Sequence, residues 1–124
     1  MADEPIDVVR RFCDAWGTAD LDELLGYFVP DAVYHNIPMD PHHGVEEIRA
    51  AVEGFMGGVE KITFRTDNIA ADGNVVLTER VDAFFLPGGK VIEIPVMGTF
   101  EVFDGKITAW RDYFDLNQFM SQMG

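Results

Sequence analysis

The hydrophobic residues at the start of the chain recur every three or four positions, which is the spacing of one helix face. Pro5 suits the first turn of a helix, and Gly17 ends the pattern. A second, shorter helix is predicted after a cap at Thr18 or Asp20, and Pro30 marks its end. The apolar faces of these helices consist of Ile6, Val9, Phe12, Cys13 and Trp16 in the first and Leu21, Leu24, Leu25 and Phe28 in the second.

The middle of the chain and its C-terminal end add one short strand and two more helices. A strand is predicted over residues 32–37, followed by a loop over 38–44. A third helix comes next and stops at Gly57, and residues 115–123 again have helical spacing. The apolar stripe of the third helix consists of Ile48, Ala51, Val52, Phe55 and Met56.

Beyond the third helix the hydrophobic period changes from helical spacing to two, which predicts strands. Asp-Gly pairs and a Pro-Gly-Gly sequence separate the alternating segments, and Asp-Gly is a strong hairpin signal because its turn positions tolerate positive φ. The predicted strands span residues 61–70, 74–86, 90–103 and 106–114. The chain is therefore predicted to be an α+β protein with the N-terminal helices on the concave face of a curved mixed or antiparallel sheet.

Length and charge narrow the classes of function. A chain of 124 residues is long enough for one domain, residues 1–124, with a full core. It has no apolar segment of 18 residues, so no membrane span is expected. The net charge of −13 repels phosphate backbones and anionic membranes, which argues against both as partners. A lone cysteine and an N-terminus that does not resemble a signal peptide favour the cytoplasm.

The sequence does not point to a cofactor or a metal. No glycine-rich loop joins a strand to a helix in a dinucleotide-binding pattern. Adjacent histidines at His42 and His43 do not easily converge on one ion, and no third ligand is suitably spaced. We therefore expect neither an organic cofactor nor a metal.

The main candidate for chemistry is Asp112 in the last predicted strand. Its period of two places Trp110 and Phe114 on the same face, so the carboxylate lies between two aromatic side chains. An ionised carboxylate there is costly to desolvate and needs a partner. Arg80 and Asp82 share one face of another predicted strand and can supply it. Two acids around one guanidinium carry a single net negative charge, so one acid can keep a proton while the other stays ionised.

Two further observations bear on this interpretation. Tyr34 and Asn36 share a face of the first predicted strand, and both groups can hold a water. A simpler alternative is that Arg80 and Asp82 form a solvated cross-strand ion pair. The aromatic residues on the same faces, including Phe84, favour a pocket instead, because an exposed stripe does not need them.

Three segments resemble the limonene-1,2-epoxide hydrolase family, within the group of cone-shaped folds that includes nuclear transport factor 2, ketosteroid isomerase and polyketide cyclases. They occur in the order found in that family and span most of the chain. The segments are Tyr34-His35-Asn36 with Pro38, Thr78-Glu79-Arg80-Val81-Asp82, and residues 105–116, Gly-Lys-Ile-Thr-Ala-Trp-Arg-Asp-Tyr-Phe-Asp-Leu.

The resemblance implies cofactor-independent hydrolysis of a small apolar epoxide to a vicinal diol. Asp112 would be the general base, Asp82 the acid and Arg80 the bridge between them, while Tyr34 and Asn36 would hold the water. It also implies a homodimer that pairs through the outer sheet face. The residues implied for the substrate pocket are Trp16, Phe55, Phe84, Ile94, Val96, Trp110, Phe114 and Phe119. Those expected on the outer face are Leu77, Val81, Ala83 and Ile107.

Two other functions remain open on the same fold. In an isomerase or cyclase, Asp112 would abstract a carbon-bound proton, and Tyr34 with a protonated Asp82 would stabilise an enolate. Arg80 argues against this, because a guanidinium favours the ionised forms of both acids. A non-catalytic binding or dimerisation module is the second alternative, since fold alone does not decide function.

Overall fold

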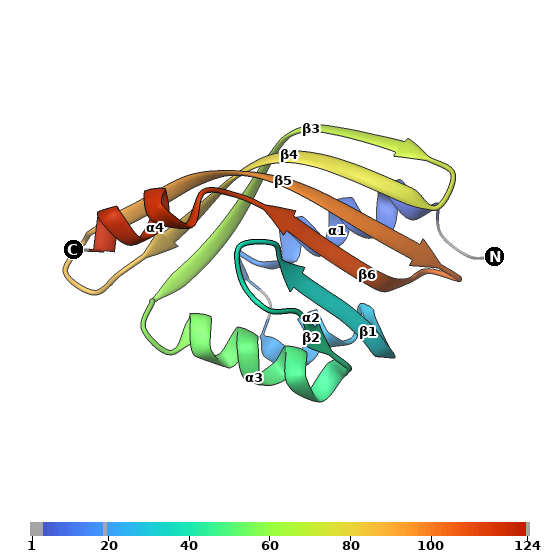
Figure 1. Cartoon of the computed structure of the whole chain (residues 1–124), viewed down its shortest axis with the longest axis horizontal. Helices are drawn as coiled ribbons and strands as arrows, with labels where there is room; N and C mark the ends of the chain where they lie inside the picture. The colour runs from blue at the N-terminus through green and yellow to red at the C-terminus, as the bar shows by residue number, and fades with distance from the viewer. Residues whose placement is uncertain (1–3, 19, 124) are drawn as a thin grey trace.

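The computed structural model describes residues 4–18 and 20–123, with helices mostly first and strands last along the chain (Figure 1). The helices are α1 (Pro5–Ala15), α2 (Leu21–Leu25), α3 (Val45–Met56) and α4 (Leu116–Met123). The strands are β1 (Phe28–Asn36), β2 (His42–His43), β3 (Lys61–Asp72), β4 (Val75–Phe85), β5 (Val91–Phe103) and β6 (Lys106–Tyr113).

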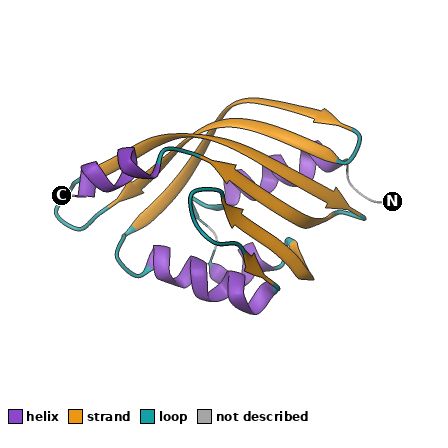
Figure 2. Cartoon of the chain, in the orientation of Figure 1, coloured by secondary structure: helices purple, strands orange, loops and turns teal. Residues whose placement is uncertain are grey.

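All six strands belong to one mixed sheet in the order β2-β1-β6-β5-β4-β3. The last four form the predicted antiparallel meander, whereas β1 runs parallel to β6. The sheet curves over α1 and α3, and α4 lies at one end of it (Figure 2). This confirms the predicted α+β architecture with the N-terminal helices on the concave side.

The core between α1 and the sheet is largely aromatic. Phe12 is fully buried, and its ring meets Trp110 edge-on at 5.1 Å between centroids. Trp110 in turn stacks on Tyr34 at 4.1 Å and on Phe100 at 5.4 Å. Burying one such side chain stabilises the fold by about 1.5–3 kcal/mol. The inner face of β6 is therefore held firmly where it approaches β1.

The structure corrects the prediction between α2 and α3. Asp20 caps α2 by accepting a hydrogen bond from the Glu23 amide at 2.8 Å, but the helix ends at Leu25. Phe28 was predicted on this helix and instead begins β1, and Pro30 lies within that strand. The pairing of β1 with β6 shifts register between Phe28 and Val33, which accommodates a residue without an amide hydrogen. The predicted loop over 38–44 contains the short strand β2, which pairs with β1.

The outer face of the sheet is partly apolar, as predicted, but Ile107 does not belong to it. Ile107 is fully buried in the core, because the pairing of β5 with β6 shifts register between Glu101 and Val102 and reverses the alternation there. Ala83 is also buried, whereas Leu77 is 46% exposed. The exposed large apolar residues of the central outer face are Leu77, Met97 and Tyr113.

Candidate active site

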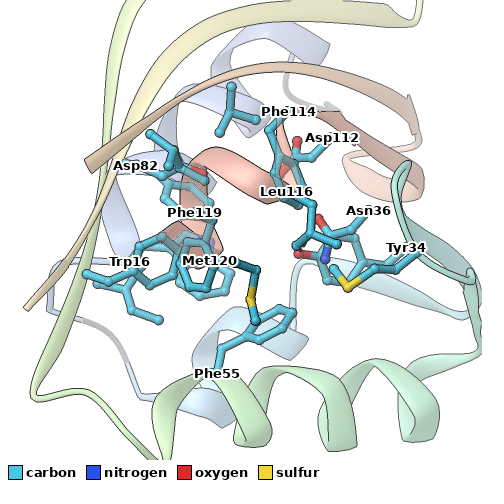
Figure 3. A pocket seen from close by; sticks show the side chains of 16 residues that line it. Trp16, Tyr34, Asn36, Phe55, Asp82, Asp112, Phe114, Leu116, Phe119 and Met120 are labelled. Carbon is cyan, nitrogen blue, oxygen red and sulfur yellow. Dashed lines mark hydrogen bonds between the residues drawn. The ribbon is translucent and has the colours of Figure 1, made fainter. Parts of the chain in front are cut away.

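The inner faces of β1, β4 and β6 bring the predicted polar residues into one place. Arg80 and Asp82 alternate inward on β4 and are buried. Asp112 on β6 is also buried and pairs in register with Asn36 of β1. Figure 3 shows Asp82 on one side of the pocket and Asp112, Asn36 and Tyr34 on the other. The curvature of the sheet makes this convergence possible, since β4 and β6 are separated by β5.

Arg80 uses all five of its N–H groups. Nε and Nη2 donate to the two oxygens of Asp82 at 3.0 and 2.8 Å. Nη1 and Nη2 donate to the two oxygens of Asp112 at 3.1 and 2.8 Å. The remaining Nη1 hydrogen goes to the Thr78 hydroxyl at 3.2 Å. The guanidinium also lies over the Phe64 ring at 4.5 Å, so it is fixed by planar contacts on its edges and its face.

Asp112 accepts one further hydrogen bond, and this makes its two oxygens unequal. Trp110 Nε1 donates to Oδ1 at 2.7 Å, and the same oxygen accepts from Arg80 Nη1. Oδ2 accepts only from Arg80 Nη2 among the contacts of the described residues. A carboxylate oxygen has two acceptor sites, so Oδ1 is saturated while Oδ2 keeps one site free.

Burial and charge set the proton affinities of these groups. Burial, with a smaller contribution from the charge of Asp112, raises the pKa of Asp82 to about 6 against the opposing effect of Arg80. Burial would lower the pKa of Arg80, but Asp112 and Asp82 keep it well above its usual value. Burial and then Asp112 raise the pKa of Tyr34, so its phenol is neutral. The site thus combines a permanent cation with one acid that holds a proton into the mildly acidic range.

Tyr34 and Asn36 form a small polar pair at the edge of this cluster. The Tyr34 hydroxyl donates to Asn36 Oδ1 at 3.2 Å, and both side chains are buried. This bond leaves the Asn36 amide hydrogens and an oxygen lone pair of Tyr34 for another partner. Stacking on Trp110 fixes the ring of Tyr34 in this position.

These polar groups open into a predominantly apolar cavity of about 200 Å³. Figure 3 shows Phe55 projecting into it from α3, with Phe119 and Met120 contributed by α4. Asn36, Asp82 and Asp112 are the strongly polar members of the lining. The full lining is Trp16, Tyr34, Asn36, Met39, Phe55, Ile62, Phe64, Asp82, Phe84, Ile94, Val96, Asp112, Phe114, Leu116, Phe119 and Met120.

Of the residues predicted to contact substrate, Trp110 does not line the cavity. It is fully buried beneath the site and supports Asp112 through its indole N–H. The other seven predicted residues, Trp16, Phe55, Phe84, Ile94, Val96, Phe114 and Phe119, line it. The set predicted to contact substrate did not include five lining residues, Met39, Ile62, Phe64, Leu116 and Met120. Alternation along the predicted strand over residues 61–70 and helical spacing after Asp115 were signals that could have identified four of them.

Within residues 4–18 and 20–123 there is neither a metal-ligand cluster nor a membrane-spanning helix. No group of three or more His, Cys, Asp or Glu side chains in these ranges is arranged to hold a metal ion. His42 and His43 lie side by side in β2. No helix within the same ranges combines the length and apolar character needed to cross a bilayer.

Comparison with known proteins decides the family. The sequence profile of the limonene-1,2-epoxide hydrolase catalytic domain matches residues 3–124. The chain belongs to the limonene-1,2-epoxide hydrolase family. It is 36% identical over 108 residues to epoxide hydrolase EphG of Mycobacterium tuberculosis, which covers 87% of this chain and 71% of that protein. As a member of this family it is an enzyme of the epoxide hydrolase class.

Solved structures agree with this membership. An M. tuberculosis epoxide hydrolase that resembles the limonene-1,2-epoxide hydrolases superposes with a TM-score of 0.84 at 34% identity, covering 98% of this chain and 90% of that one. A putative polyketide cyclase from Xanthomonas campestris superposes with a TM-score of 0.86 at 19% identity, covering 97% and 96%. The second match shows that the fold is shared beyond the hydrolase family, and it carries no further conclusion about chemistry.

Proposed function

We propose that this limonene-1,2-epoxide hydrolase family member opens an epoxide to a vicinal diol by direct attack of water, without a cofactor. Asp112 is the general base and Asp82 the general acid. One observation carries the proposal: a single buried guanidinium donates to two carboxylates at one end of an apolar cavity, beside a phenol and an amide.

The base in this proposal is a particular atom, Oδ2 of Asp112. Oδ1 already accepts from Arg80 and Trp110, whereas Oδ2 keeps one acceptor site. A water that donates one proton to Oδ2 can donate the other to the Tyr34 hydroxyl oxygen and accept from the Asn36 amide. Its remaining lone pair is then free to attack carbon. Because the water is already held in this orientation, the reaction loses less orientational entropy on reaching the transition state.

The acid in this proposal is Asp82, which completes the proton balance. The bond from water oxygen to an epoxide carbon forms as the carbon–oxygen bond of the ring breaks, and Asp82 gives its proton to the departing oxygen. The water proton ends on Asp112. Because Asp82 loses one proton and Asp112 gains one, the net charge of Asp82, Arg80 and Asp112 is the same before and after the step, and Arg80 contacts whichever carboxylate is ionised. Return of the proton from Asp112 to Asp82 through solvent restores the starting state.

The substrate class follows from the cavity. Its walls are mainly aromatic and aliphatic, so a substrate with an apolar body and an epoxide as its polar group fits both regions. Met39 and Met120 also line the cavity, and they are 40% and 56% exposed. Methionine side chains adapt to ligands of different shape. We expect small apolar cyclic or terpene-like epoxides to be turned over and strongly charged ones to be rejected.

Arg80 also disfavours the alternative enzyme, an isomerase or cyclase. An enolate-stabilising carboxyl must stay neutral at neutral pH in an apolar site. Here Arg80 opposes the effect of burial and holds the pKa of Asp82 near 6, which is low for that role. Hydrolysis needs Asp82 protonated only when a bound substrate has excluded water. A pKa near 6 is therefore more compatible with hydrolysis than with enolate stabilisation.

Isotope labelling separates direct attack of water from a covalent route. With enzyme in excess in ¹⁸O-labelled water, direct attack puts the label in the diol of the first turnover. Attack by a carboxylate would instead give unlabelled diol and a labelled protein. Unlabelled diol would overturn the proposed mechanism.

Substitution tests the two acids. D112N and D82N should each lower kcat by about 10² to 10⁴-fold, because each removes a group that moves a proton. Asp67 provides a matched control, since it forms the same pair with Arg65 two residues away but on an exposed surface. D67N should keep wild-type turnover. A well-folded D112N or D82N enzyme with near-normal turnover would exclude the assigned role.

We further propose a symmetric homodimer that pairs through the outer sheet face. Leu77, Met97 and Tyr113 form an exposed apolar patch at its centre, and the cross-strand register places Met97 opposite Tyr113. Apolar patches on a sheet face are typical of surfaces that another copy covers.

A further inference from the structure

The position of the bridging guanidinium depends on a residue that has no side chain. Gly98 lies on β5 in register with Thr78 of β4 on one side and Asp112 of β6 on the other. A Cβ at Gly98 would stand 2.7 Å from Asp112 Oδ1 and 2.9 Å from Thr78 Oγ1, and closer still to Arg80 Nη1. Real Cβ atoms do not approach other atoms this closely, so any side chain here would displace the bridge.

Backbone conformation does not explain this glycine. The described glycines with positive φ are Gly44, Gly73, Gly88, Gly89 and Gly105, and Gly98 is not among them. It lies inside a regular strand, where glycine is unfavourable because it packs nothing and loses more chain entropy on folding. Arg80 Nη1 occupies the space that a side chain at position 98 would fill. This close approach is the physical reason for a glycine at this position.

Thr78 forms the other wall of the same space. Its hydroxyl donates to the Gly98 carbonyl at 3.3 Å and accepts from Arg80 Nη1 at 3.2 Å. The first bond fixes the direction of the hydroxyl hydrogen, so that a lone pair faces the guanidinium. Thr78 is 1% exposed, so water does not replace it. It takes the one N–H of Arg80 that the two carboxylates do not use.

We propose that Thr78 and Gly98 are positioning residues that hold Arg80 midway between Asp82 and Asp112 and so balance the proton affinities of the acid and the base. This inference rests on the proposed roles of the two carboxylates. Neither positioning residue contacts substrate, because neither lines the cavity. Thr78 affects the reaction through Arg80, and Gly98 does so through Arg80 and the adjacent Oδ1 of Asp112.

The principal test is T78V, which keeps the shape of the side chain and removes its hydroxyl. One buried guanidinium N–H then has no acceptor, so Arg80 shifts relative to the two acids. We expect kcat to fall about 10- to 100-fold while KM changes by about twofold or less. The pH dependence of kcat/KM should move by about half a pH unit or more. T78S keeps a hydroxyl and should recover kcat to within about threefold of wild type.

G98A tests the space itself, and Gly54 supplies the control. A Cβ at Gly54 has nothing within 4 Å, so G54A should leave kcat unchanged. G98A should lower kcat by about 100-fold or more if it folds. If it does not fold, T78V with T78S still decides the question. A T78V enzyme with wild-type kcat and pH profile would overturn the inference, as would a T78S enzyme as impaired as T78V.

Parallel assays of D82N and D112N distinguish this inference from the proposed function. Should those two variants stay active, the proposed roles of the acids fail, and the inference fails with them. Should they lose activity while T78V and its pH profile match wild type, only the role of Thr78 and Gly98 fails.

Discussion

Replacing Arg80 by lysine keeps the charge of the buried cluster and removes its planar geometry. Arg80 makes five donor contacts, whereas a lysine ammonium has three hydrogens that diverge from one nitrogen. At least two hydrogen bonds to charged or polar partners are therefore lost. At about 1.5–3 kcal/mol for each bond to a charged group, the total loss is about 3–6 kcal/mol. The contact of the planar cation with Phe64 is lost as well.

This loss should divide between stability and catalysis. We expect the free energy of unfolding of R80K to fall by about 3 kcal/mol, because two buried carboxylates become poorly compensated. Turnover should fall by about 10²-fold or more, since the ammonium cannot bridge Asp82 and Asp112 in one plane. Denaturant unfolding at pH 7 measures the first quantity, and kcat on a cyclic epoxide measures the second.

Arg65 supplies the control, because it also donates through Nε and Nη2 to an aspartate two residues further along its strand. That pair is exposed, so R65K should leave both the unfolding midpoint and kcat unchanged. An R80K enzyme with wild-type kcat would refute the bridging role. If stability fell but kcat did not, Arg80 would be a structural residue only.

Two other predictions concern proton affinity and assembly. Burial raises the pKa of Asp82 to about 6, and the acid must be protonated to act. The value of kcat/KM should therefore decrease as the pH rises above about 6. A kcat/KM that stays constant between pH 5 and 8 would contradict the role of Asp82 as the acid. Light scattering at micromolar concentration should give about twice the chain mass of 13.9 kDa. The substitution M97D places a charge in the outer apolar patch, so this variant should give the mass of a single chain. A monomeric wild-type protein would exclude the proposed homodimer.

Alternation along the strands was enough to predict the polar cluster. In a regular strand, the face of the sheet on which a side chain lies depends only on whether its position is odd or even. Arg80 and Asp82 face inward for this reason, and so does Asp112. The same alternation gave the wrong face for Ile107, because a register shift inserts an extra residue there and exchanges the inward and outward positions of the strand. Alternation also does not show how deeply a side chain is buried: Trp110 shares a face with Asp112, but its indole is covered by the rings of Phe12 and Phe100 and lies in the core.

The positioning residues were harder to predict than the charged ones. A glycine inside an alternating segment has no local signal that distinguishes close packing from simple tolerance. Its role emerges only from the register that places Gly98 between Thr78 and Asp112, and that register is a property of three paired strands. Thr78 has the inward parity of Arg80, yet a buried hydroxyl becomes informative only when its two hydrogen-bond partners are known.

The cation at position 80 is what separates the possible chemistries of this cavity. Without it, two buried carboxylates facing each other could not both ionise, and one would hold its proton strongly, as an enolate-stabilising site requires. With Arg80 bonded to both, the pair carries one net negative charge and the acid keeps a pKa near 6. Such an acid can give up its proton and regain it near neutral pH, and this is what a hydrolase needs in every turnover. The same argument explains why Arg80 must be held centrally: a shift toward Asp82 would weaken the acid's hold on its proton, and a shift toward Asp112 would weaken the base.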